Sequence, residues 1–246
     1  MRLKDKVAII TGAGQGIGQA TALKFAREGS RVAVCDINRS AVDMTVEAIV
    51  ANGGEALGYT IDVTDKASIA KMVEGVMGAW GRIDTLVNNA GIVQDAQFRK
   101  MTDDQFERVI DVNLKGVYNV TKAVVDIMIE QNSGCILNAS SIVGIYGNFG
   151  QTNYAATKFG VIGMVKTWAR ELGRKGIRSN AICPGFVETP ILGTIPDKVL
   201  EAMKARVPMG RLAKPEEIAS TYAFLASDEA SYINGAVIEV SGGATI

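Results

Sequence analysis

Residues 7–18 read Val-Ala-Ile-Ile-Thr-Gly-Ala-Gly-Gln-Gly-Ile-Gly, a short apolar run that passes directly into a glycine-rich turn. The run at 7–11 is typical of a buried strand, and apolar positions spaced by three and four begin at Gly16, which indicates a helix. Glycines let backbone N–H groups approach a pyrophosphate, and a helix start adds unpaired donors. The stretch therefore predicts a dinucleotide-binding turn. The residues expected at the phosphates are Gly12, Gln15, Gly16, Ile17 and Gly18.

The glycine spacing in this turn is GxxxGxG, through Gly12, Gly16 and Gly18. The Rossmann fingerprint GxGxxG does not fit, because Ile17 stands where its third glycine would be. A glycine-rich turn can also be a tight connection that binds nothing. Other parts of the sequence are needed to distinguish between these two interpretations.

On both sides of this stretch, short β-branched runs alternate with longer segments of helical periodicity, as in βαβ units around a parallel sheet. The predicted strands are residues 7–11, 31–35, 56–61, 85–88, 134–139, 178–182 and 236–240. The predicted helices are residues 16–28, 39–51, 66–80, 102–130, 153–173 and 215–226. We therefore expect an α/β protein with a Rossmann-type, doubly wound, parallel seven-stranded sheet and helices on both faces. With 246 residues and no linker or repeat, we expect a single domain over residues 1–246.

Residues 184–211 are the least regular part of the chain and contain four of its five prolines. A long irregular segment in a compact domain is usually functional, and the apolar residues within this one favour a lid over a substrate pocket. An ordinary surface loop is the alternative.

The composition excludes several classes of function. Lys+Arg and Asp+Glu both number 26 and no long basic run occurs, so nucleic acid is not an expected partner. Histidine is absent, which excludes Ser-His-Asp and Cys-His nucleophiles and histidine zinc sites. Cys35, Cys135 and Cys183 lack metal or redox spacing and are expected to be buried, so no metal site is predicted. The N-terminus has no signal-peptide core and no apolar run approaches a membrane span, so we expect a cytoplasmic protein without membrane contact.

The end of the second predicted strand indicates which dinucleotide would bind. Asp36 lies 24 residues beyond Gly12, about where a carboxylate bonds the adenosine ribose hydroxyls. Its charge would repel a 2′-phosphate, and neither Gln15 nor Ile37 offers a cation to hold one. NAD(H) is therefore the predicted cofactor, although Asp36 could also be a turn residue. Other side chains expected at this carboxyl edge of the sheet, around the adenine and ribose, are Ile37, Asp62, Val63, Asn89, Ala90 and Gly91.

Without histidine, Tyr154 and Lys158 become the candidates for proton transfer. Residues four apart share one helix face. A cation about 4 Å away at an effective dielectric of about 20 is worth roughly 4 kcal/mol, which would lower the pKa of a tyrosine by about three units. The spacing therefore predicts a phenol able to act as general acid or base, with an ordinary surface pair as the alternative.

Ser141 and Asn113 belong to the same expected site. Ser141 closes the fifth predicted strand 13 residues before Tyr154, where its hydroxyl can bond a carbonyl oxygen. Asn113 is a polar residue in an otherwise core-like helical stretch. A turn serine and a buried structural amide are the alternatives for these two positions.

Taken in order, the glycine turn, Asp62, residues 88–91, Asn113, Ser141, Tyr154 with Lys158, and Pro184-Gly185 resemble the short-chain dehydrogenase/reductase family over the whole chain. The resemblance implies catalysis by Asn113, Ser141, Tyr154 and Lys158. Tyr154 would exchange a proton with the substrate oxygen that Ser141 polarises, Lys158 would bond the nicotinamide ribose, and Asn113 would hold a relay water. It further implies that the nicotinamide contacts Tyr154, Lys158, Pro184, Gly185, Val187 and Thr189. The reaction that the resemblance implies is reversible hydride transfer between a ketone and a secondary alcohol, without a metal. It also implies a homotetramer that pairs the helices from Thr102 and Asn153.

Within the family, residues 153–160 and 223–230 resemble the ketoreductases of fatty-acid synthesis. Those enzymes usually have an arginine in the glycine turn, use NADPH and dock an acidic carrier through cations before the fifth strand, whereas this chain has Gln15, Asp36 and no cation at 130–135. The expected substrate pocket is mainly apolar: Ser141, Val143, Tyr146, Phe149, Tyr154 and Ile191. These features predict an NAD-dependent short-chain alcohol dehydrogenase or carbonyl reductase for small hydrophobic, including aryl, secondary alcohols and ketones. A 3-oxoacyl-[acyl-carrier-protein] reductase, a non-catalytic nucleotide-sensing scaffold, and a lyase or epimerase are the alternatives.

Overall fold

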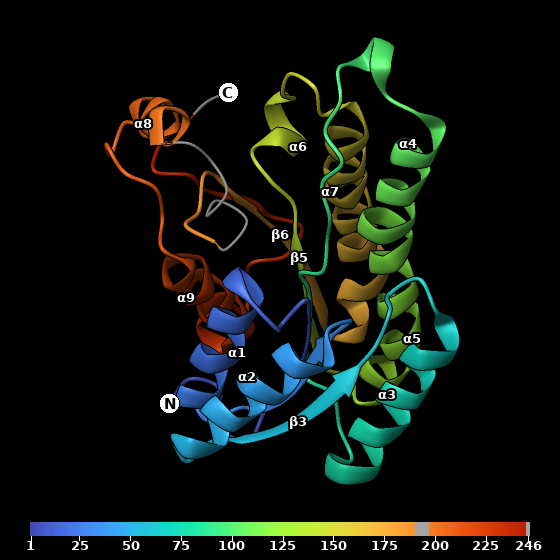
Figure 1. The fold of residues 1–246 in the computed structure, drawn as a ribbon. Coiled ribbons are helices and arrows are strands. Elements are labelled where there is room, and N and C mark those ends of the chain that lie inside the picture. The colour runs from blue at the N-terminus through green and yellow to red at the C-terminus, as the bar shows by residue number, and fades with distance from the viewer. Residues whose placement is uncertain (190–196, 245–246) are drawn as a thin grey trace.

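Seven strands form one parallel sheet, as predicted (Figure 1). Numbered along the chain, they lie in the order 3-2-1-4-5-6-7. The computed structural model describes residues 1–189 and 197–244. The strands are β1 (Val7–Thr11), β2 (Arg31–Asp36), β3 (Glu55–Thr60), β4 (Thr85–Asn88), β5 (Gly134–Ala139), β6 (Ile177–Pro184) and β7 (Val237–Val240). Each strand begins and ends within two residues of its predicted bounds, because Gly, Pro, Asn and Asp beside the strands indicate in the sequence where the strands end.

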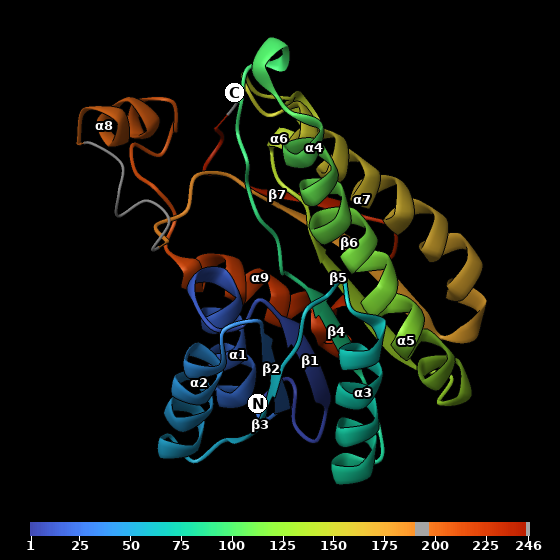
Figure 2. The ribbon, with the colours of Figure 1, turned by 45° about the vertical axis from the view of Figure 1, so that its right-hand side comes forward.

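Helices cover both faces of this sheet. The α-helices are α1 (Gly16–Arg27), α2 (Arg39–Ala51), α3 (Lys66–Trp80), α4 (Asp103–Ile110), α5 (Gly116–Glu130), α6 (Val143–Tyr146), α7 (Thr152–Leu172), α8 (Asp197–Ala205) and α9 (Pro215–Ala226). Short 3₁₀ turns occur at η1 (Phe98–Lys100), η3 (Gly173–Lys175) and η5 (Asp228–Ala230). Figure 2 shows α1, α2 and α9 on one face, and α3, α5 and α7 on the other. This arrangement is the predicted doubly wound fold.

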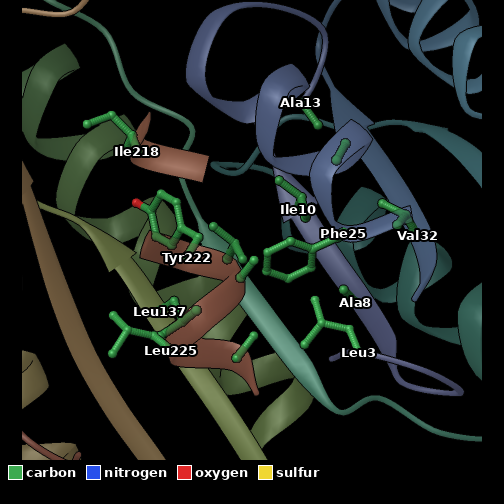
Figure 3. Close-up of a cluster of buried hydrophobic side chains, with 14 of the residues drawn as sticks. Leu3, Ala8, Ile10, Ala13, Phe25, Val32, Leu137, Ile218, Tyr222 and Leu225 are labelled. Carbon is green, nitrogen blue, oxygen red and sulfur yellow. The ribbon is translucent and has the colours of Figure 1, made fainter. Parts of the chain in front are cut away.

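Strand β1 illustrates why the strands have apolar side chains on both of their faces. Ala8 and Ile10 point into a cluster with Phe25 of α1 and Tyr222 of α9 (Figure 3). The alternate residues, including Ile9, point into a second cluster on the opposite face with α3 and α5. Successive side chains of a strand face opposite sides, so a strand covered on both faces must be apolar throughout.

The sheet order also places the functional edge of the molecule. The chain builds β1, β2 and β3 outward in one direction and then returns to place β4 beside β1. In open α/β sheets, ligands bind outside the carboxyl ends of the strands at such a reversal. The carboxyl ends of β1 and β4 therefore mark the expected crevice.

Two sequence predictions are corrected by the structure. The helix predicted at 102–130 is divided into α4 and α5 by a π turn, η2 (Asp111–Lys115), which apolar spacing alone does not distinguish from continuous α-helix. The segment 184–211, predicted to be irregular, contains α8, whose helix-forming residues lie between prolines and glycines that obscured them. The predicted lid role of this segment falls partly on residues outside the described ones.

Two other expectations concern cysteines and membranes. Cys35, Cys135 and Cys183 are buried free thiols, as predicted. Across residues 1–189 and 197–244, no helix is both long and apolar enough to cross a bilayer.

Candidate active site

The glycine turn has the backbone geometry that its sequence requires. Gly12 and Gly16 have positive φ angles of 63° and 56°. Helix α1 begins at Gly16, and its N-cap residue Gln15 makes no side-chain cap hydrogen bond. Within the described part of the chain, the N–H groups of the first turn therefore have no side-chain acceptor, and this end of the helix favours an anion. Of the other expected phosphate residues, Ile17 packs partly against the core.

Asn89 connects this turn to β4. Its Nδ2 donates to the carbonyl oxygens of Thr11 (3.2 Å) and Gly12 (3.1 Å). A Cβ on Gly18 would overlap the Gly12 carbonyl oxygen and lie 2.6 Å from Asn89 Nδ2. Gly18 is therefore needed for the close approach between α1 and the turn.

Asp36 ends β2 beside the same turn. Its Oδ2 accepts a hydrogen bond from Gly14 N (3.0 Å) and its Oδ1 accepts one from Asn38 N (3.0 Å). A carboxylate has about four acceptor positions, so it can still accept from a ribose hydroxyl. Arg39, the nearest following cation in the sequence, is held by the carboxylate of Asp43 at 2.9 Å.

Two further groups expected around the nucleoside lie at the carboxyl ends of β3 and β4. Asp62 Oδ1 accepts from the backbone N–H and the hydroxyl of Thr64, both at 2.8 Å, and Val63 is buried against Gly116. At the end of β4, Ala90 N donates to Thr11 Oγ1 (3.1 Å). An uncapped helix start, a close glycine turn and a strand-end carboxylate together fit a dinucleotide.

Tyr154 and Ser141 meet on the other side of this edge. Tyr154 lies in the first turn of α7, and Ser141 follows β5, where its Oγ accepts from Val143 N (3.1 Å). Burial raises the pKa of Tyr154 to about 12, and a hydrogen bond with the Ser141 hydroxyl opposes that rise. The phenol is therefore protonated at neutral pH and is paired with the group expected to polarise a substrate.

Lys158 lies one turn further along α7 and is buried, with 4% of its surface exposed. Its Nζ donates to Ala139 O (2.7 Å) and lies 5.4 Å from the centroid of the Tyr154 ring. Burial lowers the pKa of Lys158 to about 8. The predicted net lowering of the Tyr154 pKa by Lys158 is wrong, because burial of the phenol raises this pKa and the effect that opposes the rise is the hydrogen bond with Ser141.

Asn113 lies in the π turn between α4 and α5 and is completely buried. Its amide holds both backbone groups of Ile92: Oδ1 accepts from Ile92 N (2.8 Å) and Nδ2 donates to Ile92 O (2.9 Å). A Cβ on Gly91 would lie 3.3 Å from Asn113 Oδ1 and 3.7 Å from Lys158 Nζ. Gly91 thus lies between Asn113 and Lys158, and the Asn113 amide retains one hydrogen and one acceptor position for a relay water. π turns are frequent at functional sites.

The residues expected at the nicotinamide and the substrate lie around the ends of β5 and β6. Ile142 N donates to Pro184 O (3.1 Å), which places the residue after Ser141 beside Pro184. A Cβ on Gly185 would lie 2.9 Å from Ser241 Cα, so this position has no room for a side chain. Val187 is buried in the core, and Thr189 is partly exposed.

Of the expected pocket residues, Val143 is buried and Phe149 is 81% exposed. The Tyr146 hydroxyl donates to Glu239 of β7 (3.0 Å), so its proton is not available to a substrate. Ile191 lies outside the described residues. The structure therefore brings together Asn113, Ser141, Tyr154 and Lys158, whereas Tyr146 points its hydroxyl toward β7.

Sequence reasoning missed the role of Asn153 in this site. This buried side chain contacts the backbone of three elements around Tyr154. A polar residue directly before the tyrosine, in the first turn of a helix, was the available signal.

A cavity of about 550 Å³ lies at the opposite, amino-terminal edge of the sheet. Among its lining residues are Lys6, Arg178, Asp228 and Tyr232. None of the described site residues lines this cavity, so it is separate from the site at the carboxyl edge. Within residues 1–189 and 197–244, no group of three or more His, Cys, Asp or Glu side chains is placed to hold a metal ion.

Comparison with known proteins gives likenesses that extend over nearly the whole chain. Residues 12–245 match the family model described as "Enoyl-(Acyl carrier protein) reductase". The chain is 52% identical over 246 residues to the 3-oxoacyl-[acyl-carrier-protein] reductase FabG of Thermotoga maritima, with both chains covered in full. It is 44% identical over 254 residues to the (3R)-3-hydroxyacyl-CoA dehydrogenase of Canis lupus familiaris, covering 99% of this chain and 97% of the relative. The crystal structure of levodione reductase superposes with a TM-score of 0.95 at 38% identity, covering 98% of each chain.

Proposed function

Because the chain belongs to the short-chain dehydrogenase/reductase family, we propose that it is an NAD(H)-dependent oxidoreductase that interconverts 3-oxoacyl and 3-hydroxyacyl thioesters. The observation that supports this proposal is the placement of Tyr154, in the first turn of α7, against Ser141 at the end of β5 and within 5.4 Å of Lys158 Nζ, measured to the ring centroid. The sequence alone favoured small hydrophobic alcohols and ketones. The relatives named for 3-oxoacyl and 3-hydroxyacyl substrates favour the thioester alternative instead.

Each catalytic residue has a separate role in the proposed reaction. When bound, the dinucleotide supplies the hydride for the ketone carbon in reduction, or takes it up in oxidation. Ser141 donates a hydrogen bond to the ketone oxygen, and Tyr154 transfers its proton to the same oxygen, so that ketone, hydride and proton give the alcohol. Lys158 keeps a positive charge near the phenolate that remains. Preorganised donors at the oxygen where charge develops are the usual source of such catalysis.

The preference for NAD(H) rests on Asp36. Its carboxylate accepts a hydrogen bond from Gly14 N in the glycine turn. The Arg39 guanidinium is paired with the Asp43 carboxylate and is therefore not free to hold a 2′-phosphate. A fixed negative charge at the ribose disfavours a phosphate there by like-charge repulsion.

The thioester can be carried by coenzyme A or by an acyl carrier protein. Residues 130–135 contain no cation, which weighs against docking of an acidic carrier. However, this segment comes just before β5 and therefore lies at the amino-terminal edge of the sheet, opposite the candidate site. Its charge does not decide between the two carriers. The homotetramer is also part of the proposal, with Tyr118 of α5 and Phe159 of α7 each about half exposed on the helices expected to pair.

Initial rates on a substrate panel test this function. We expect kcat/KM for acetoacetyl thioesters with NADH to exceed that for simple and aryl ketones by at least about tenfold, or about 1.4 kcal/mol. The coenzyme A and carrier thioesters are compared in parallel, and NADH consumption is measured against product. Faster turnover of simple ketones would restore the small-alcohol interpretation. Product formed without stoichiometric NADH oxidation would indicate a lyase or epimerase, and NADH binding without turnover a scaffold.

Asp36→Ala tests the cofactor preference. A hydrogen bond to a charged group contributes about 1.5–3 kcal/mol, so we expect the ratio of kcat/KM for NADH to that for NADPH to fall by at least about tenfold. Asp126→Ala, which removes an exposed carboxylate on α5, is the control and should leave the ratio unchanged. An unchanged ratio in Asp36→Ala would show that this carboxylate does not select the cofactor.

A further inference from the structure

Asn153 immediately precedes Tyr154 in α7 and is completely buried. Its Nδ2 donates to Gln94 O (2.9 Å) and to Gln105 O (3.0 Å), and its Oδ1 accepts from Tyr154 N (2.8 Å). Both amide hydrogens are therefore used, and each of the three partners is a backbone atom. A single side chain thus fixes the backbone of Tyr154 to two other parts of the chain.

One of those parts is the segment of residues 92–97, which we name the crossing segment. It runs from the end of β4 toward α4 and is held to the start of α7 by further hydrogen bonds. Ala96 N donates to Gly150 O (2.9 Å), and Gln151 Nε2 donates to the Asp95 carboxylate (3.0 Å). At its other end, Asn113 holds Ile92. The crossing segment is therefore fixed between two buried amides, one from each side of the site.

If the only role of Asn153 were to stabilise α7, an amide side chain would not be needed at this position. The N-cap of α7 is Gln151, which makes no side-chain cap hydrogen bond, so Asn153 is not the helix cap. Serine or aspartate could accept a hydrogen bond from a first-turn N–H, but neither can donate two bonds away from the helix at neutral pH. Asn153 directs both of its donors to the crossing segment and α4, which indicates that the relative position of these elements is what its side chain determines.

We infer that Asn153 is a positioning residue that holds Tyr154 in register with Ser141 by tying the start of α7 to the crossing segment. The inference rests on the proposed function, because it assigns Asn153 an effect only through the proton transfer by Tyr154. Misplacement of a reacting group by about 1 Å can cost about 100-fold in rate. Asn153 itself touches neither the substrate nor the dinucleotide in this assignment.

The test compares Asn153→Ala and Asn153→Ser with a matched buried amide. Asn180 is also completely buried, and its side chain also bridges backbone groups, donating to Ile233 O (2.9 Å) and accepting from Ala236 N (2.9 Å). Asn180→Ala therefore reports the loss of stability alone. We expect Asn153→Ala to lower kcat for thioester reduction by about 30- to 100-fold. The Kd for NADH should stay within about threefold of wild type, and Asn180→Ala should keep kcat within about twofold despite a similar fall in Tm.

Asn153→Ser keeps the inference testable if the alanine variant does not fold, because serine keeps a local acceptor but cannot reach both carbonyls. We expect an intermediate loss of kcat and a shifted pH profile for oxidation of the 3-hydroxyacyl thioester. Purely structural roles would lower Tm without moving kcat per folded enzyme or the pH profile, and that result would overturn the inference. If Asn153 variants keep full kcat while Tyr154→Phe loses it, the inference fails alone; if Tyr154→Phe also keeps it, the proposed function fails.

Discussion

Tyr154→Phe is expected to lower kcat for thioester reduction by about 1,000-fold or more, while the Kd for NADH stays within about threefold. The ring and its packing are kept, and only the hydroxyl that bonds Ser141 and supplies the proton is lost. Positioned general acids contribute about 100- to 10,000-fold, and the upper part of that range applies because the chain has no histidine that could take over. Steady-state rates and NADH fluorescence titration give the two values.

Tyr222→Phe is the matched control for this variant. Tyr222 is fully buried whereas Tyr154 is partly buried, and burial raises the pKa of both phenols. Its hydroxyl has no hydrogen-bond partner among the described residues, so its removal breaks no bond there. We expect unchanged kcat and unchanged or slightly higher Tm. Equal activity of Tyr154→Phe and Tyr222→Phe would refute the role of Tyr154 as general acid.

The fold was predictable because its signals are local. Each strand of the sheet is an apolar run limited by Gly, Asn, Asp or Pro, and the alternation of strands with helical segments permits few topologies other than a doubly wound parallel sheet. The π turn at Asp111–Lys115 was not predictable, because one extra residue in a turn changes apolar spacing by less than the variation within ordinary helices. Helix α8 was hidden for another reason, since the prolines and glycines around it indicate loop.

The residues of the candidate site that lie in short motifs were predictable, because their side chains carry the chemistry. The pairing of Tyr154 with Ser141 follows from their places at a strand end and a helix start. The bonds of Asn153 and Asn113 to the backbone of the crossing segment and of α4 could not be predicted, because their partners are backbone atoms about 20 to 60 positions away and any residue type supplies a backbone carbonyl. The direction of the Tyr154 pKa shift also depends on burial, which a four-residue spacing cannot give.

Gly18→Ala is expected to weaken NADH binding by at least about 100-fold, or about 2.7 kcal/mol, although alanine is the better helix former. Two effects oppose each other at this position. Replacing a glycine inside a helix by alanine stabilises the helix by up to about 1 kcal/mol. However, the new Cβ would overlap the Gly12 carbonyl oxygen, which belongs to the backbone and cannot rotate away, and it would press on Asn89 Nδ2. The clash exceeds the gain, so the start of α1 must move away from the turn and Asn89 must release its bonds to Thr11 and Gly12.

Gly78→Ala in α3 separates these two effects, because a Cβ there meets no atom of the described structure within 4 Å. This control should gain helix stability and raise Tm slightly, with an unchanged Kd for NADH. Isothermal titration with NADH and thermal unfolding of both variants give the comparison. Gly18→Ala should lose both Tm and affinity, and the affinity loss should remain when binding is measured well below Tm, where the protein is folded. NADH binding within threefold of wild type in Gly18→Ala would show that the close approach of α1 to Gly12 is not what holds the pyrophosphate.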